Sequence, residues 1–128
     1  MSLRSPLGRV LGLGSAKGGS AHWYAQRVTA VALVPLGGWF VAALASLDSG
    51  SHASVVAWLG SPVSSLLAVL FVGVAACHAN LGLQVVVEDY VAGHGTRVAA
   101  LVAIKFALVV GALTGILAVL RIAFGVQA

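Results

Sequence analysis

The chain has 128 residues, of which 60% are hydrophobic and only 8% are charged, and its mean hydropathy is +1.06. Soluble domains are about 25% charged, and so few charges are unable to cover the large relative surface of a short chain. This composition excludes an ordinary soluble fold and indicates an integral membrane protein. The net charge of +4 comes from seven scattered basic residues, which do not form the basic face of a nucleic-acid-binding protein.

The first membrane-spanning segment is predicted at residues 28–47. These residues carry no charge, and as a helix they reach about 30 Å, which is the thickness of the hydrocarbon core of a bilayer. Pro35 lies inside this segment, and membrane helices tolerate proline where neighbouring groups satisfy the freed carbonyl. Residues 1–21 are expected to be a flexible basic segment that precedes a single membrane domain at residues 22–128.

Two further spans are predicted along the chain. Ser61 followed by Pro62 is a helix start signal, and the uncharged sequence after it gives a second span at residues 62–87. The third span is predicted at residues 98–120, with Lys105 as its one charged residue. The polar residues 48–61 and 88–97 are expected to form a loop and a short turn. The predicted fold is therefore an all-α membrane protein with three transmembrane helices.

The distribution of basic residues predicts the orientation of these helices. Four basic residues precede the first span, and none lies in residues 48–61. By the positive-inside rule the N-terminus lies in the cytoplasm, or in the matrix of an organelle, and the C-terminus lies on the opposite side. The turn at residues 88–97 then faces the cytoplasm. The bacterial inner membrane is the favoured location, ahead of the mitochondrial inner membrane.

His78 is the histidine that lies deepest in a predicted membrane span. It lies about 13 Å from the cytoplasmic edge of the second span, where an ionisable side chain is costly and therefore indicates function. Gly82, one turn later, leaves a recess in which a porphyrin can lie beside an axial imidazole, although the same glycine also suits close helix packing. The other histidines, His22, His52 and His94, lie at or outside the span borders. A second axial ligand is therefore expected from a partner or a second copy.

Other polar residues gather at the cytoplasmic borders. Asp89 and Tyr90 end the second span, either as ordinary border residues or as a tyrosine hydroxyl that donates to a quinone carbonyl, with the carboxylate beside it. Arg27 opens the first span, either as a positive-inside anchor or as the partner of an anionic haem propionate. Lys105 can extend to the cytoplasmic edge and receives no role.

Three motifs together suggest a known family. They are Gln26-Arg27-Val28-Thr29-Ala30 at the start of the first span, His78-x-x-x-Gly82 in the second, and Asp89-Tyr90-Val91 at its end. This pattern resembles the D-type hydrophobic membrane-anchor subunit of succinate dehydrogenase, respiratory complex II, from about His22 to Arg121. The resemblance implies a succinate:ubiquinone oxidoreductase made of a flavoprotein subunit, an iron-sulfur subunit and two three-helix anchors that share haem b and a ubiquinone site.

The resemblance also implies roles for individual residues. His78 is expected to be an axial ligand of the haem iron, with Gly82 packed against the haem, and the second, cytochrome b-type anchor subunit is expected to supply the other ligand. Arg27 is expected near a haem propionate, and His22 near the same surface without a defined role. Tyr90 is expected to donate a hydrogen bond to a ubiquinone carbonyl, with Asp89 beside it. The succinate-oxidising site is expected on the flavoprotein and not on this chain.

Three alternatives remain open at this stage. A haem-free anchor of the fumarate-reductase type would also bind an iron-sulfur subunit and quinone, but the central position of His78 argues against it. A small proton-coupled transporter would use His78 as a proton relay, but such carriers usually need a carboxylate within the membrane, and the three acidic residues all lie at borders. In a purely structural subunit, His78 is a packing residue and Tyr90 only an interfacial aromatic.

Overall fold

The structure is a computed structural model that describes residues 19–47 and 51–125. Within these ranges the chain forms only helices, with no strand. In chain order the helices are α2 (Gly19–Ala45), α3 (His52–Leu59), α4 (Pro62–Tyr90) and α5 (His94–Ala123). The three long helices α2, α4 and α5 are each long and apolar enough to cross a membrane. The predicted all-α fold with three spans is confirmed.

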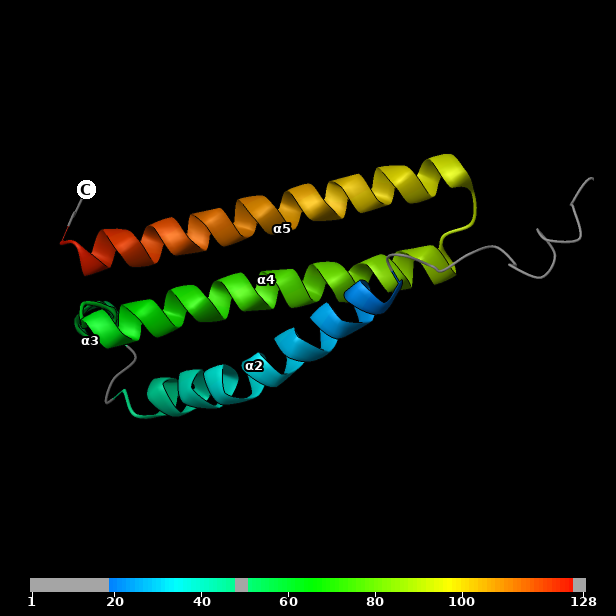
Figure 1. Cartoon of the computed structure of the whole chain (residues 1–128). Coiled ribbons are helices and arrows are strands. Elements are labelled where there is room, and N and C mark those ends of the chain that lie inside the picture. Colours follow the sequence, from blue (N-terminus) through cyan, green and yellow to red (C-terminus); the bar gives the residue numbers. More distant parts are fainter. Residues whose placement is uncertain (1–18, 48–50, 126–128) are drawn as a thin grey trace, which may run out of the picture.

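The long helices lie side by side with α4 in the middle. Figure 1 shows α2 along one side of α4 and α5 along the other, and α4 packs against both. The start of α4 follows the sequence signal, because the Ser61 side chain accepts a hydrogen bond from the Ser64 backbone and Pro62 occupies the first helical position, where its missing N–H costs nothing. The central helix is therefore the one whose side chains meet both neighbours.

The helices extend beyond the uncharged segments because helical hydrogen bonding can continue outside the hydrocarbon. The turn expected over residues 88–97 is reduced to residues 91–93, where Gly93 has a φ of 93°, a value that glycine adopts without a Cβ clash. Helix α2 likewise begins before its uncharged segment, at Gly19. Residues 19–21 of the segment expected to be flexible are therefore helical, and residues 1–18 lie outside the described range.

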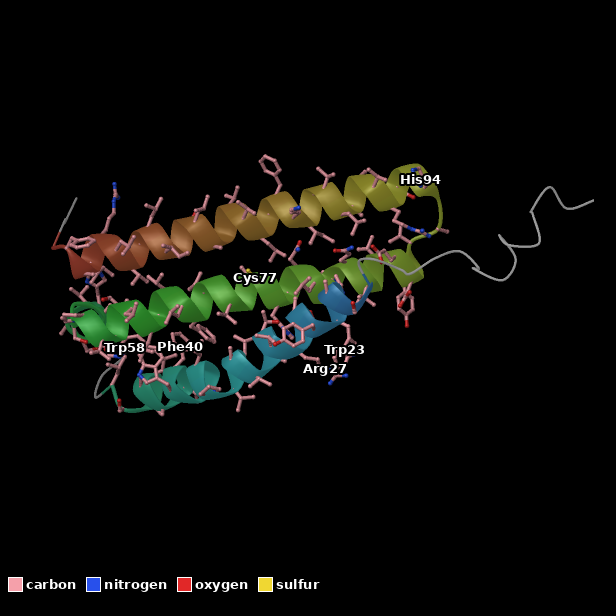
Figure 2. All side chains as sticks on the ribbon, viewed as in Figure 1. Trp23, Arg27, Phe40, Trp58, Cys77 and His94 are labelled. Carbon is pink, nitrogen blue, oxygen red and sulfur yellow. The ribbon has the colours of Figure 1, made fainter. Side chains whose placement is uncertain are left out.

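The segment expected as a loop at residues 48–61 contains the short helix α3. Ser51 caps this helix by accepting a hydrogen bond from the Ser54 backbone. Trp58 of α3 lies 6.0 Å from Phe40 of α2 between ring centroids, and Phe40 stacks on Phe71 of α4 at 4.8 Å. Figure 2 shows Phe40 and Trp58 next to each other at this end of the molecule. Aromatic contacts thus join α3 to α2 and α2 to α4 at this end of the molecule, and residues 48–50 lie outside the described range.

Helix α2 changes direction along its length, as Figure 1 shows. Pro35 lies within it, and a proline ring removes one helical hydrogen bond and bends the helix. The residues before Pro35 approach the C-terminal half of α4, whereas those after it lead to the aromatic packing around Phe40. This bend brings the start of α2 to the part of α4 that carries His78.

Very little of the described chain is buried. Only Ser65, Ala68, Val87 and Val119 are buried among the described residues, while large apolar side chains are exposed along all three long helices. In a bilayer these side chains meet lipid tails or other membrane chains, and neither contact is costly. The helices therefore present wide apolar faces to lipid or to other subunits.

Candidate functional site

His78 lies half-buried between α4 and α2. Its Nδ1 atom is 3.0 Å from the Thr29 hydroxyl oxygen, and its Nε2 atom is 3.4 Å from the side-chain nitrogen of Gln26. Both ring nitrogens therefore contact side chains of α2. The imidazole is held at the interface of two helices and does not project into lipid.

The α2 side of this contact is a polar stripe formed by His22, Gln26 and Thr29. Their spacing of four and then three residues places them on one helix face, and all three are half-buried. His22 Nε2 and Gln26 Oε1 are inaccessible to solvent and have no hydrogen-bond partner in the described part of the chain. Polar atoms left unpaired in an apolar medium are costly, so this stripe has the properties of a surface completed by a polar ligand or another chain.

Gly82 provides a recess next to the imidazole. A Cβ atom added at this glycine would lie 3.5 Å from the Gln26 side-chain nitrogen. The Gln26 amide can approach α4 here because residue 82 has no side chain. The recess, the amide and the Nε2 atom of His78 are therefore contiguous. Next to Nε2, the nearest group from the neighbouring helix is thus the end of a flexible side chain and not a backbone segment.

Arg27 lies on a different side of α2. Its guanidinium carbon is 5.4 Å from the ring centroid of Trp23, a cation–π distance, and both side chains are exposed. Figure 2 shows Arg27 extending from the side of α2 that faces away from α4. The structure therefore brings His22, but not Arg27, to the polar stripe that faces α4.

Asp89 and Tyr90 are the last two residues of α4. Tyr90 is 84% exposed, Asp89 is also exposed, and neither side chain makes a hydrogen bond within the described ranges. They lie about 18 Å along the helix from His78, at about 1.5 Å per residue. The tyrosine hydroxyl is thus free to donate to a ligand at the membrane border.

Three further polar residues of α4, Cys77, Asn80 and Gln84, lie on the side that meets α5. A groove of about 280 Å³ between the two helices is lined by Cys77 and Asn80 of α4 and by Lys105 of α5, among mostly apolar neighbours, and Figure 2 shows Cys77 on this side of α4. Gln84 continues the same side and donates a hydrogen bond of 2.8 Å to Glu88. The side of α4 that meets α5 is thus distinct from the side that carries His78.

The donor set around His78 is compatible with a haem. Nowhere in residues 19–47 or 51–125 do three His, Cys, Asp or Glu side chains gather closely enough to hold a metal ion. A haem needs less from the protein, because the porphyrin supplies the equatorial nitrogens and the protein supplies axial ligands. One imidazole from this chain and one from a partner meet that need.

Sequence reasoning did not identify the contacts of Gln26 and Thr29 with His78. Both residues belong to the motif at the start of the first span, but the motif alone does not show which side of α2 faces α4. The available signal was the spacing of His22, Gln26 and Thr29, which places three polar side chains on one face of an otherwise apolar helix. Such a polar stripe in a membrane helix indicates a protein contact.

Comparison with known proteins agrees with this architecture. Residues 1–119 match the family described as succinate dehydrogenase/fumarate reductase transmembrane subunit. The chain belongs to this family. Among its relatives are succinate dehydrogenase hydrophobic membrane anchor subunits of Rickettsia bellii, 33% identical over 80% of this chain and 82% of the relative, and of Paracoccus denitrificans, 38% identical over 71% and 70%. The same subunit of Rickettsia conorii is 34% identical over 66% of this chain and 68% of its own.

Membership of the succinate dehydrogenase/fumarate reductase transmembrane family confirms two sequence predictions. The resemblance to the hydrophobic anchor subunit is confirmed by relatives that carry this name. The location in a bacterial membrane is confirmed because these relatives are bacterial membrane anchors and because this chain has three helices able to span a membrane. The assignments of individual residues to haem and quinone stay predictions.

Proposed function

We propose that the chain is a membrane-anchor subunit of a succinate:ubiquinone oxidoreductase. In this role it holds an iron-sulfur subunit and a flavoprotein subunit at the membrane, and His78 provides one axial ligand of haem b. The anchor function is supported by the names of the relatives. The haem assignment is carried by one observation: His78 has Nδ1 hydrogen-bonded to Thr29 and Nε2 beside the recess at Gly82.

The residues around His78 fit a haem on three grounds. The Nε2 atom meets only a long 3.4 Å contact from Gln26, which a metal–nitrogen bond would replace. The recess contains a flexible amide and no backbone. The buried Nε2 of His22 and Oε1 of Gln26 lack hydrogen-bond partners among the described residues, and such unpaired polar atoms are costly, so a polar ligand near them would be favourable. When bound, a haem supplies a one-electron carrier near the quinone.

The proposed quinone site is at the cytoplasmic end of α4. The exposed hydroxyl of Tyr90 donates a hydrogen bond to a ubiquinone carbonyl, which polarises the carbonyl and fixes the head group. Reduction to ubiquinol takes two electrons, from the iron-sulfur subunit, and two protons, from cytoplasmic water. Asp89 is exposed beside Tyr90 and relays protons to this position. The orientation of Arg27 over Trp23 supports an anchoring role, and its contact with a propionate stays a prediction.

The haem assignment is tested on the complex purified through a tag on this chain in mild detergent. A dithionite-reduced minus oxidised absorption spectrum is recorded for the parent, for His78→Ala and for His94→Ala. His94 is exposed at the start of α5 and is the matched control. We expect a b-type haem band in the parent and in His94→Ala, and its loss in His78→Ala with all subunits still present. An intact parent complex without haem would refute the ligand role and favour a haem-free anchor of the fumarate-reductase type.

The anchor function is tested separately by co-purification. The tagged chain is expected to retain a flavoprotein and an iron-sulfur protein in the detergent extract, and the membranes are expected to oxidise succinate with reduction of ubiquinone. His78→Ala is not expected to release these subunits, because the imidazole lies between α2 and α4 inside the membrane. Recovery of the chain without either subunit under mild conditions would refute this function.

A further inference from the structure

The Thr29 hydroxyl connects His78 to the backbone of α2. Its oxygen is 3.0 Å from Nδ1 of the imidazole, and it donates a hydrogen bond of 2.8 Å to the Ala25 carbonyl one turn earlier. The Gln26 carbonyl lies within 3.1 Å of the same oxygen. Thr29 is half-buried, so water competes poorly for these bonds.

The proton of this hydroxyl determines which nitrogen of His78 carries a hydrogen. The Thr29 hydroxyl has one proton, and its shortest contact is the 2.8 Å bond to the Ala25 carbonyl; with the proton there, the hydroxyl accepts from Nδ1–H. The Gln26 amide nitrogen, which can only donate, faces Nε2 at 3.4 Å and fits a lone pair on that atom. The distances match this assignment, since 2.8 Å is typical of O–H···O bonds and 3.0 Å of N–H···O bonds. A neutral imidazole that is protonated at Nδ1 has its free lone pair on Nε2. This is the nitrogen next to the recess.

We infer that Thr29 is a positioning residue that fixes the tautomer and ring orientation of His78 and so prepares Nε2 as a haem ligand. The inference rests on the proposed function of His78. Histidine ligands almost always donate their second ring N–H to an acceptor, which orients the ring and raises its basicity. In this chain the acceptor is a side chain of a different helix, so the packing of α2 against α4 sets the ligand geometry.

Gln26 has a different part in the same arrangement. Its side-chain nitrogen is 3.4 Å from Nε2, a long contact, and its side-chain oxygen Oε1 is buried without a hydrogen bond among the described residues. An amide held so weakly is displaced easily when a ligand takes its place. Thr29, by contrast, contacts Nδ1, the ring nitrogen that would not bind the iron, so its hydrogen bond would be kept when Nε2 serves as the ligand.

The test compares Thr29→Val, Thr29→Ser and Thr114→Val in the complete complex. Valine has the shape of threonine without the hydroxyl, and serine retains the hydroxyl. Thr114 is the matched control because it lies in α5, is exposed and makes the same bond of 2.8 Å to a carbonyl one turn earlier, with no imidazole nearby. The readouts are the haem midpoint potential, the low-spin ferric EPR signal, and the rate of haem loss to an excess of apomyoglobin.

In Thr29→Val we expect a higher midpoint potential, because a less basic imidazole stabilises ferric iron less, together with a shifted EPR signal. We expect the affinity for haem to fall about 10-fold or more, the loss of affinity typical when a metal ligand loses its hydrogen-bond partner, and haem transfer to apomyoglobin to be faster accordingly. Thr29→Ser and Thr114→Val are expected to match the parent.

Each contrary result overturns a defined claim. A parent with haem and a Thr29→Val variant with unchanged potential, EPR signal and haem loss would refute the positioning role and leave the haem ligation standing. Equal changes in Thr29→Val and Thr29→Ser, or in Thr114→Val, would also refute it, because the hydroxyl at this position would then not be the cause. An intact parent complex without haem would refute the proposed haem ligation itself.

Discussion

Replacement of Gly82 by alanine should separate helix stability from haem binding. Alanine in a helix interior is favoured over glycine by about 1 kcal/mol, which lowers the unfolded fraction about fivefold. The new Cβ would lie 3.5 Å from the Gln26 side-chain nitrogen, an ordinary van der Waals distance, so no clash offsets this gain. Under the proposed function the same methyl group occupies the recess beside Nε2 of His78, and haem content should fall.

The matched control for Gly82→Ala is Gly73→Ala. Gly73 lies in the same helix, and a Cβ there meets nothing within 4 Å, so the stability gain should be similar and haem content unchanged. The assay combines thermal unfolding of the purified complex with haem quantification by difference spectrum. Because a bound haem stabilises the complex that holds it, a lower melting temperature for Gly82→Ala than for Gly73→Ala is expected only together with the loss of haem; at equal haem content it would show that the new methyl group clashes. Full haem content in Gly82→Ala would refute the assignment of the recess to haem.

Three further predictions concern other parts of the chain. Tyr90→Phe removes an exposed hydroxyl and should raise the KM for ubiquinone by about 2- to 10-fold, the value of one hydrogen bond. Succinate oxidation with a water-soluble acceptor should stay unchanged, and an unchanged KM for ubiquinone would contradict the quinone role. Phe40→Leu loses ring contacts to α3 and α4, worth about 1 to 3 kcal/mol together, and should lower the melting temperature. Phe106 is exposed, so Phe106→Leu should leave the melting temperature unchanged, and equal effects of the two substitutions would contradict the packing argument. Gly93→Ala places an alanine at a φ of 93°, at a cost of about 1 to 3 kcal/mol, whereas a Cβ at Gly95 meets open space. Gly93→Ala should therefore unfold at a lower temperature than Gly95→Ala, and equal melting temperatures would contradict the strain argument.

The sequence predicted the long helices better than their connections. Uncharged runs of membrane length identify a span almost without regard to neighbours, since lipid itself demands a helix. Helix α3 was missed because its eight residues, His52–Leu59, form too short an apolar run after polar Ser51 and His52 to indicate a helix. In the structure Trp58 of this helix contacts aromatic rings of α2, a contact that the sequence does not show. The ends of α4 and α5 were placed too far inside for a related reason, as hydropathy reports the membrane and not the hydrogen bonding of the backbone.

The candidate site was predicted in part. The depth of His78 and its proximity to Gly82 follow from residue spacing along one helix. The contacts with Thr29 and Gln26 depend on how α2 is rotated about its axis and bent at Pro35, and neither quantity can be obtained from hydropathy. The outward direction of Arg27 follows from the same rotation, because consecutive helical residues point about 100° apart.

The scarcity of buried residues has a consequence for how the cell makes this protein. With so few side chains enclosed by the described helices, most of the stabilising contacts must come from lipid and from other chains, and stability then depends on the concentration of binding partners. A newly inserted copy that finds no partner keeps wide apolar faces without protein contacts and lacks the stabilisation that binding to other chains provides. The amount of this subunit in the membrane should therefore follow the supply of its partners more closely than its own rate of synthesis.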